Sequence, residues 1–415
     1  MSLAADPPPL ICVVVTSAEL GGAERMLVDL LQGIPPSRFR FHVVLPRLGR
    51  LALELDQLHV SYEVLSFGGS LSKAGRSGIK AKAALGAVVD VVRYLWLYTR
   101  MVVRLKPRLV YTHGLKAELL TGIASHWLRL PVVWHLHTFV PKDGWLGRLH
   151  RYLQRRTRML VANSKAVSAG VLPPASNKTK VVYCGVDIKA FLPQSKSAAE
   201  ESLHLTPDAS KLRVGMVSVL APWKGLDVFL RAVQPLLRAD ARWQAMIVGD
   251  PIYDTAGHQG YDGVLKQLAC DLEIADRVVF LPYQQRPASA YACLDIFVHA
   301  AKKPEPFGRV IAEAMCMQRA VIATAGGGAI EQIESGVDGL LVAMDDVGAL
   351  RAQVARLMAD ATLRHQLGLA ARSKVLRQGS MAQFTLRMAT VLDEAIGARP
   401  PHAGNSNTET RHRAA

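Results

Sequence analysis

The chain has 415 residues, of which half are hydrophobic and 20% are charged, so it is long enough for two globular domains and is not disordered. Its formal net charge of +16 favours an anionic partner: acidic lipid, a phosphate-bearing substrate or nucleic acid. Five cysteines are scattered singly with no Cys-x-x-Cys pair, which argues against a disulfide framework or a zinc knuckle and is typical of a reducing cytoplasm.

The positive charge is concentrated in the first half of the chain. Residues 1–200 carry 27 Lys and Arg against 12 Asp and Glu, so nearly all of the basic excess lies there. These basic residues are not interleaved with a platform of stacking aromatic side chains, so nucleic acid is not an expected partner. The expected anionic partner is therefore either a membrane surface or a phosphorylated substrate.

Short apolar runs alternate with helical patterns from the first strand onward. The runs typical of buried strands lie at 10–17, 39–46, 108–114, 131–138, 159–164 and 181–187. Segments with apolar residues at helical spacing follow them, beginning with 21–34. This alternation predicts an α/β domain over residues 10–190, with a doubly wound parallel sheet and ligands at the carboxyl ends of its strands.

The most membrane-like stretch is 88–105, but Arg93, Arg100 and Arg104 interrupt it well below the ~18 uncharged residues that a span requires. It predicts either an amphipathic helix that covers a sheet or a helix that lies on an anionic membrane surface. The first ten residues lack the basic region of a signal peptide. We expect a cytoplasmic protein, with a peripheral position on the inner face of the cytoplasmic membrane as the sharper alternative.

Residues 188–210 are polar, carry no strand signal and predict a linker. The alternation then restarts, with strand-like runs at 212–220, 243–250, 276–282, 294–300, 320–325 and 339–343. A second Rossmann-like domain is therefore expected over 211–378. A helix over 379–397 should pack back towards the first domain, and 398–415 predicts a disordered tail. Two such domains place the ligand site in the cleft between them.

Two predicted loops at strand ends can contact phosphate. Gly21 and Gly22 follow the first strand and open a helix whose free N–H groups attract an anion, although many strand–helix turns use glycines for packing alone. Lys224 and Gly225 lie in the loop after the first strand of the second domain. Lys224 can neutralise a diphosphate, or it can be an ordinary surface lysine.

The stretch KKPEPFGRVIAEAM, residues 302–315, is more informative. Glu305 precedes a Pro-Phe-Gly turn, and Glu313 lies inside the helix that follows. The first turn of that helix offers orphan backbone donors to an anion, at Phe307, Gly308, Arg309 and Val310. Glu305 can accept hydrogen bonds from sugar hydroxyls and Glu313 from a ribose. Alternatively, the two acids only complement the helix dipole, which is worth ~0.3–1 kcal/mol each.

Two further features lie at strand ends. The glycine turn 326–328 follows a predicted strand and should border the same site as Glu305. His113, His135 and His137 end two strands of the first domain, and no carboxylate or cysteine accompanies them at ligand spacing. We therefore expect no metal there and expect a histidine of this group to contact an acceptor hydroxyl.

Together, four segments resemble those of the retaining glycosyltransferases of family 4, whose two Rossmann-like domains form the GT-B fold. They are the GGAE turn (21–24), the PWKG loop (222–225), the E-P-F-G-x4-E block (305–313) and the GG-x2-E-x-I turn with the apolar run after it (327–342). The resemblance covers about residues 10–397, and the glutamate block is its most specific part.

The resemblance implies a role for each matching residue. Glu305 would contact the donor sugar and Glu313 the nucleotide ribose, while Lys224 and the amides of residues 307–310 would hold the diphosphate. Gly22 would approach the phosphates from the first domain, and His137 stands where the family has a histidine on the acceptor side. The sequence departs from the family where Gly-Arg-Leu is usual, since Ser218-Val219-Leu220 stands there. It also has Cys184 where Asn-Gly-Val-Asp begins in the family.

The implied reaction moves a hexosyl unit from a nucleotide diphosphate sugar to a lipid-linked or polysaccharide acceptor, as in cell-envelope polysaccharide biosynthesis. Transfer would proceed with retention, without a cofactor and without a divalent metal, since Lys224 and the helix start neutralise the leaving diphosphate. UDP-, GDP- and ADP-sugars all remain candidate donors. A nucleotide-sugar epimerase and a non-catalytic nucleotide-sugar binding protein are the alternatives on the same fold.

Overall fold

The apolar runs of the first half pair side by side in one parallel sheet. In the computed structural model, which describes residues 7–69, 84–140, 143–251 and 260–397, this sheet has seven strands. Their spatial order is β3 (Ser61–Val64), β2 (Arg40–Leu45), β1 (Leu10–Val15), β4 (Leu109–His113), β5 (Val132–Leu136), β6 (Met159–Ala162) and β7 (Thr179–Val181). The central strands are buried along their whole length, as expected for a sheet covered on both faces.

Helices cover both faces of this first sheet. Their bounds are α1 (Gly22–Gly33), α2 (Arg50–Gln57), α4 (Ala84–Leu105), α5 (Leu115–Leu128), α6 (Gly144–Gln154) and α7 (Lys165–Ser168), with a 3-10 turn η2 (Ala175–Lys178). α1 and α2 pack on one face, in the same core as Val13 and Val43. α4, α5 and α6 pack on the other face, in a core with Cys12 and Trp134.

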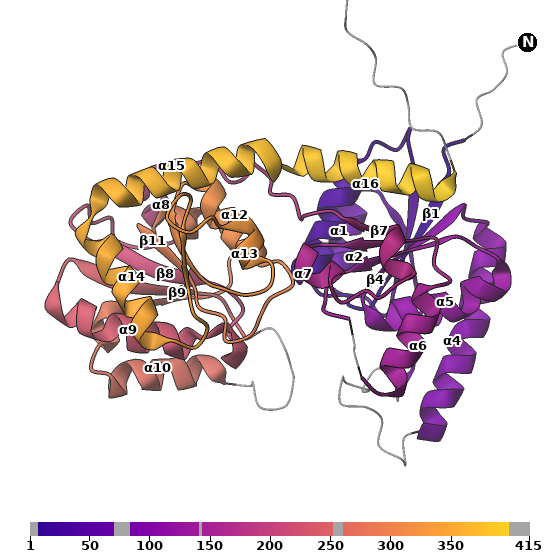
Figure 1. Cartoon of the computed structure of the whole chain (residues 1–415), viewed down its shortest axis with the longest axis horizontal. Coiled ribbons are helices and arrows are strands. Elements are labelled where there is room, and N and C mark those ends of the chain that lie inside the picture. Colours follow the sequence, from indigo (N-terminus) through magenta and orange to yellow (C-terminus); the bar gives the residue numbers. More distant parts are fainter. Residues whose placement is uncertain (1–6, 70–83, 141–142, 252–259, 398–415) are drawn as a thin grey trace, which may run out of the picture.

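The second domain has a six-stranded parallel sheet, with order β10 (Val278–Leu281), β9 (Trp243–Val248), β8 (Leu212–Val217), β11 (Ile296–His299), β12 (Ala320–Thr324) and β13 (Leu340–Val342). Its helices are α8 (Lys196–Ser202), α9 (Leu226–Ala239), α10 (Tyr261–Asp271), α11 (Ala288–Ala292), α12 (Arg309–Cys316), α13 (Ala329–Gln332), α14 (Val347–Ala359) and α15 (Ala361–Gln378), with 3-10 turns η3 (Pro222–Lys224) and η4 (Ala275–Arg277). The predicted fold, two doubly wound parallel-sheet domains, is confirmed (Figure 1).

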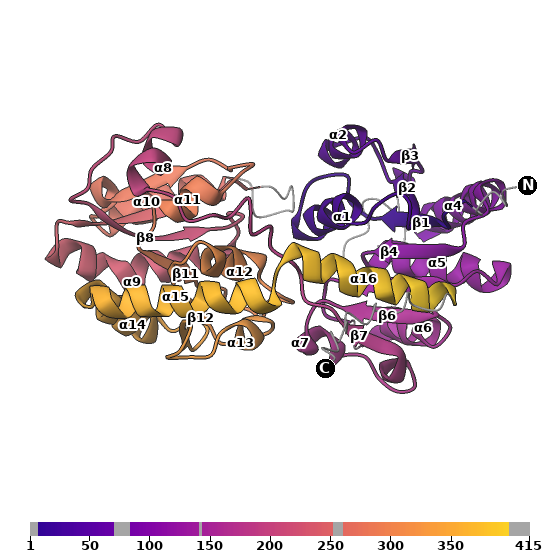
Figure 2. The same ribbon diagram turned by 90° about the horizontal axis from the view of Figure 1, so that it is seen from above.

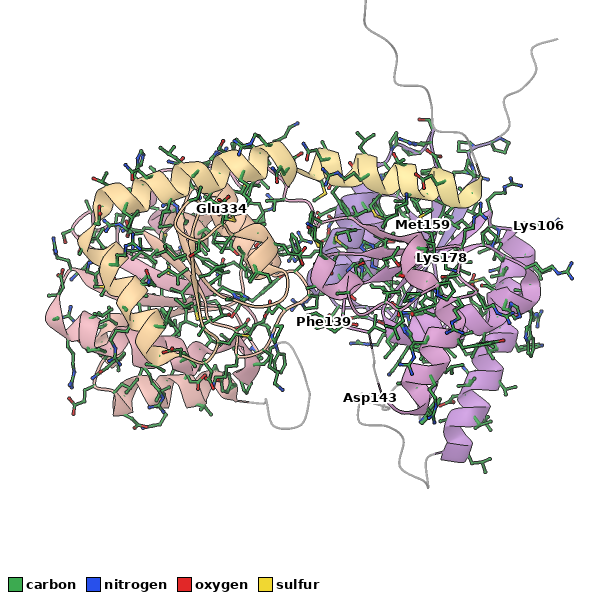
Figure 3. All side chains as sticks on the ribbon, viewed as in Figure 1. Lys106, Phe139, Asp143, Met159, Lys178 and Glu334 are labelled. Carbon is green, nitrogen blue, oxygen red and sulfur yellow. The ribbon has the colours of Figure 1, made fainter. Side chains whose placement is uncertain are left out.

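The last helix, α16 (Met381–Ile396), returns to the first domain. Figures 1 and 2 show α15 lying over the second domain and α16 continuing across the first. Phe384 and Met388 of α16 are buried in the same core as Met26 and Leu27 of α1. The chain crosses between the domains at Ser380, which bridges to Val186. Figure 3 shows that Asp143, at the start of α6, lies at the end of the first domain opposite α16.

Three local predictions differ from the structure. The stretch 188–210, expected to be a plain linker, contains α8, whose N-cap Ser195 accepts a hydrogen bond from the amide of Ala198. β3 was not predicted, because SYEV has no apolar run and is only partly buried. The strand predicted at 181–187 is β7 and ends at Val181. None of the helices in the described residues is long and apolar enough to cross a membrane. The expected tail, 398–415, lies outside the described residues.

Candidate active site

The loop between β11 and α12 leaves the first backbone N–H groups of α12 without a side-chain cap. Gly308 has a φ of +85°, in the left-handed region that favours glycine, and α12 begins immediately after it. No side chain caps the first turn of α12. Uncapped N–H groups at a helix start can attract a negatively charged group, and the role expected of residues 307–310 stays a prediction.

The glycine turn 326–328 lies directly against this loop. At Gly327, whose φ is +59°, an added Cβ would meet the carbonyl oxygen of Glu305 at 1.9 Å. At Gly328 it would meet Cα of Phe307 at 2.5 Å, and the amide of Gly328 donates to the Glu305 carbonyl oxygen at 2.9 Å. Only glycine allows this approach, so the turn fixes the backbone on which the Glu305 side chain stands.

Lys224 reaches Glu305 from the loop after β8. Its Nζ lies 2.5 Å from Oε1 of Glu305, and both side chains are largely buried. The loop is anchored beside the glutamate because the amide of Lys302 donates to the carbonyl oxygen of Trp223 at 2.9 Å. His299, the last residue of β11, places Nε2 at 3.3 Å from Oε2 of Glu305. The glutamate therefore has a cation on one oxygen and an imidazole on the other.

This arrangement keeps Glu305 ionised. Burial alone would raise the pKa of its carboxyl group, but the Lys224 ammonium and the His299 ring outweigh burial and hold the pKa well below the ordinary glutamate value. The resulting stabilisation is present at neutral pH and is lost only as the pH falls through that lowered pKa. A permanently charged acceptor of this kind suits the hydroxyl groups of a sugar.

Glu313 lies about one turn into α12, and its side chain has partners other than those of Glu305. Its Oε2 accepts a hydrogen bond from the Tyr291 hydroxyl at 2.8 Å, and its Oε1 lies 3.7 Å from Nε of Arg309. Burial, together with the charge of Glu313, raises the pKa of Tyr291 well above the ordinary value, so the phenol stays a donor. The two glutamates thus have different partners and do not form a pair.

Arg309 connects the two domains, a role that the sequence analysis did not assign to its side chain. Its Nη2 lies 3.0 Å from Oδ2 of Asp29 in α1, and its Nη1 donates to the carbonyl oxygen of Gly22 at 3.2 Å. An added Cβ at Gly22 would lie 3.9 Å from the Arg309 side chain. The GGAE turn of the first domain is therefore held against the start of α12.

Glu331, in the GG-x2-E segment, makes a second contact between the domains. Its two carboxylate oxygens accept hydrogen bonds from the amides of Lys165 and Ala166, each at 2.8 Å. The Tyr183 hydroxyl also donates to Glu331, at 2.9 Å. One carboxylate of the second domain thus accepts hydrogen bonds from two backbone amides at the start of α7 in the first domain. The sequence motif showed the glutamate but not its partners, which lie about 150 residues away in the chain.

We expect Asp29→Asn to loosen the contact between the domains. Losing the charge on Arg309's partner should lower kcat/KM about tenfold, or ~1.4 kcal/mol, which is typical of a weakened hydrogen bond between charged groups. Small-angle scattering should show a larger radius of gyration without ligand. Asp56→Asn, an exposed change on α2, is the control and should alter neither value. Unchanged scattering together with an unchanged kcat/KM for Asp29→Asn would contradict the role of this ion pair.

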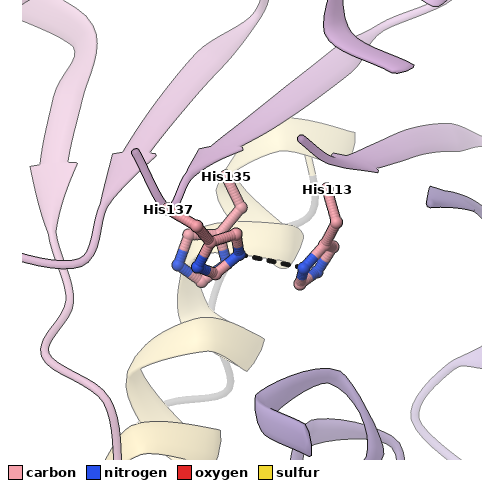
Figure 4. Close-up of side chains that lie close together, drawn as sticks. All are labelled: His113, His135 and His137. Carbon is pink, nitrogen blue, oxygen red and sulfur yellow. Dashed lines mark hydrogen bonds between the residues drawn. The ribbon is translucent and has the colours of Figure 1, made fainter. Parts of the chain in front are cut away.

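The three strand-end histidines of the first domain gather in one cluster (Figure 4). His113 and His135 stand opposite each other in the register of β4 and β5, and His137 follows β5. Nε2 of His137 lies 2.9 Å from Nδ1 of His113. Burial lowers the pKa of all three rings, that of His137 to about 3, with the Arg309 charge contributing to the shift of His137.

The structure brings the predicted residues into three groups. Lys224 and Glu305 form one group with His299, which sequence reasoning missed although it belongs to the strand before the glutamate block. Gly22 and Glu313 meet at Arg309. His137 lies with the other histidines in the first domain. Val219, where the family has an arginine, is partly buried and places no charge beside Lys224.

Two family models match the chain. That of the "Glycosyl transferases group 1" matches residues 200–374, and that of the "Glycosyltransferase Family 4" matches residues 20–190. The first match covers the second domain, and the second covers most of the first domain. Together they include both domains.

Individual proteins are similar to parts or all of the chain. A lipopolysaccharide core biosynthesis mannosyltransferase, LpsB of Rhizobium meliloti, is 30% identical over 52% of this chain and 59% of its own length. A D-inositol 3-phosphate glycosyltransferase of Mycobacterium ulcerans is 35% identical over 43% of this chain and 37% of its own. The chain thus spans about half the length of these curated relatives.

Among solved structures, HepE of Anabaena in complex with UDP and glucose has a TM-score of 0.77 and 26% identity. The match covers 92% of this chain and 99% of HepE, so it includes both domains and their relative arrangement. From the two family models and this structural match, the chain belongs to the GT-B glycosyltransferases of family 4, of the group 1 type.

Proposed function

We propose that this protein transfers a hexosyl unit from a nucleotide diphosphate sugar to a lipid-linked or polysaccharide acceptor, with retention at the anomeric carbon. The observation that carries this proposal is the Lys224–Glu305 pair beside the uncapped start of α12. One charged carboxylate, one ammonium and a row of backbone donors converge there. A sugar with a diphosphate attached has the hydroxyls and the anion that these groups recognise.

The residues of the candidate site have different roles in the proposed reaction. Negative charge develops on the leaving diphosphate in the transition state, and Lys224 and the α12 amides can stabilise it without a divalent metal. Both Glu305 oxygens are engaged by Lys224 and His299, which suits holding sugar hydroxyls better than attacking the anomeric carbon. We therefore favour a route in which the acceptor attacks on the face that the diphosphate leaves, so the configuration is retained.

The relatives support a sugar donor of this class. HepE has been solved with UDP-glucose as well as with UDP and glucose, and LpsB is a mannosyltransferase of the lipopolysaccharide core. These are properties of those proteins, and UDP-, GDP- and ADP-sugars all stay candidate donors here. The lipopolysaccharide relative also favours an acceptor of the cell envelope.

A donor screen tests the proposal directly. UDP-, GDP- and ADP-sugars should be compared by thermal shift, and the matching donor should raise the melting temperature most. At 100 times its dissociation constant a ligand stabilises the folded state by ~2.7 kcal/mol. Transfer should continue in excess EDTA, and NMR of the product should show the anomeric configuration of the donor. Epimerised donor formed without any acceptor would instead favour an epimerase.

The exposed surface of α4 supports the proposal that the acceptor lies at a membrane. This helix buries one stripe against the sheet, including Tyr94, Tyr98 and Met101. Its opposite side carries a second apolar stripe whose members are each at least 56% exposed: Leu85, Val88, Val89, Val92, Trp96 and Val103. Arg93, Arg100 and Arg104 flank this stripe, and Arg100 lies over the Trp96 ring at 4.8 Å. A helix of this kind can lie on an anionic bilayer.

We expect the triple change Val89→Ser, Val92→Ser and Trp96→Ser to weaken binding to vesicles containing an anionic lipid at least tenfold. Sedimentation with anionic and with neutral vesicles measures this, and added salt should weaken the wild-type binding. A matched control replaces three exposed apolar residues elsewhere: Val264, Leu369 and Leu386. Equal binding of the wild type to both kinds of vesicle would remove the membrane from the proposal.

A further inference from the structure

Three histidine side chains converge at the carboxyl ends of β4 and β5. His113, His135 and His137 each offer one ring nitrogen, and these three atoms lie within 4.8 Å of one another. Figure 4 shows the rings side by side at the ends of the two strands. The parallel register of β4 and β5 sets His113 opposite His135, so the sheet itself holds two of the three in place. This is the only such group among the described residues.

Two nitrogens of this cluster are buried without a partner. Nε2 of His113 and Nε2 of His135 make no hydrogen bond, although the two residues are only 2% and 0% exposed. An unsatisfied buried polar atom costs ~1–3 kcal/mol, so a partner for these atoms would stabilise the site. A ring nitrogen with a free lone pair is what a neutral imidazole offers a metal, and the unpartnered Nε2 atoms of His113 and His135 can take that role.

His135 also has the outer support that metal-binding histidines usually need. Its Nδ1 is hydrogen-bonded to the Tyr111 hydroxyl, which leaves Nε2 as the nitrogen available to a ligand. Such a partner on the second nitrogen fixes the tautomer and the orientation of the ring. Tyr111 is fully buried, so this orientation is held by the core of the first domain.

The spacing is close to that of ligands on one ion. The three candidate ligand nitrogens lie within 4.8 Å of one another, whereas two nitrogens bound to tetrahedral zinc at ~2.0–2.1 Å are separated by roughly 3.3–3.4 Å. Nδ1 of His113 and Nε2 of His137 share a hydrogen bond at 2.9 Å, which leaves Nε2 of His113 for the metal, and a rotation of the half-buried His137 ring turns a nitrogen of that ring towards the ion. The positive charge of Arg309 acts on His137 and opposes a cation there, but the carboxylates of Asp29, at 3.0 Å, and Glu313, at 3.7 Å, offset part of that charge.

We propose that His113, His135 and His137 bind one divalent transition-metal ion of the zinc type. An all-nitrogen set favours zinc, cobalt, nickel or copper over magnesium and calcium, which take oxygen ligands. Three protein ligands leave a fourth position open, on the side of His137, the least buried ring. This proposal replaces the expectation from the sequence that no metal binds at these strand ends, which rested on the lack of a carboxylate or cysteine nearby. The site does not include Lys224 or Glu305, so the diphosphate chemistry proposed above needs no change.

Cobalt(II) binding to chelator-treated protein tests the site without any enzyme assay. We expect one equivalent to bind, with the visible absorption of cobalt bound by nitrogen ligands, and zinc but not magnesium to displace it. His135→Gln and His137→Gln should each abolish this absorption. His365→Gln, an exposed change on α15, should leave it intact. Tyr111→Phe should keep the stoichiometry and weaken binding by roughly 10–100-fold.

Circular dichroism shows which variants are folded. If the variant at the fully buried His135 does not fold, the His137→Gln variant decides the test. Cobalt bound equally well by folded His137→Gln, or lost in His365→Gln, would overturn the proposal. Absence of binding to the wild type would overturn it as well. The donor screen does not depend on the histidine cluster, so the metal site and the donor part of the proposed function can fail independently.

Discussion

Glu305→Gln should lower kcat/KM for sugar transfer by about 10²–10³-fold while both domains stay folded. The change keeps the shape of the side chain but removes the negative charge that Lys224 and His299 hold in place. Losing one preorganised electrostatic contact to a reacting group commonly costs a factor of this size. The loss should appear mainly in kcat, because the nucleotide part of the donor is held by other groups.

The stability of the variant distinguishes a site role from a structural one. Removing the partner of Lys224, whose side chain is only 17% exposed, leaves an ammonium poorly compensated and should lower the free energy of unfolding by a few kcal/mol at most. Glu334→Gln, an exposed change in the same domain, is the control. A folded Glu305→Gln protein with wild-type transfer would contradict the donor-site assignment.

The sequence predicted the architecture because parallel strands leave a strong local signal. Runs such as LICVVV and WQAMIV are apolar throughout, since both faces of the sheet are covered. The half-exposed β3 and the short α8 carry no such run, and they were missed or taken for a linker. The strands were therefore predicted where burial dominates, with bounds up to about three residues too long at an end, and elements were missed where tertiary packing alone orders the chain.

The candidate site likewise combines local features that the sequence predicted with long-range contacts that it could not predict. Gly308 and the uncapped α12 could be anticipated, because the turn and the helix start are local in sequence. The Arg309–Asp29 contact spans 280 positions, and nothing near either residue indicates the other. The histidine cluster depended on which two strands are neighbours. Spacing in the sequence could not bring His113 to His137, but the pairing of β4 with β5 does.

Lys224→Met should also reduce kcat by about 10²–10³-fold. The loss should come from weaker stabilisation of the leaving diphosphate and not from a lost contact with the sugar. The ammonium lies 2.5 Å from Glu305, just before α12, and Val219 supplies no second cation where the family has an arginine. Because the Arg309 side chain is engaged by Asp29 and Gly22, charge that develops on the diphosphate would then be stabilised mainly by backbone amides. Binding of the free nucleotide diphosphate should weaken less, by roughly tenfold, since the amides and Glu313 remain. Isothermal titration and steady-state kinetics measure the two effects.

Lys302→Met is the matched control, because Lys302 is a partly buried lysine near the same loop whose ammonium lies 2.6 Å from Asp227 instead of Glu305. It should leave kcat within about twofold. The double variant Lys224→Met with Glu305→Gln should be less impaired than the product of the single effects, since residues in direct contact are not independent. Strictly multiplicative losses would show that Lys224 and Glu305 act on separate parts of the donor. A Lys302→Met loss equal to that of Lys224→Met would assign the effect to general positive charge and remove the specific role of Lys224.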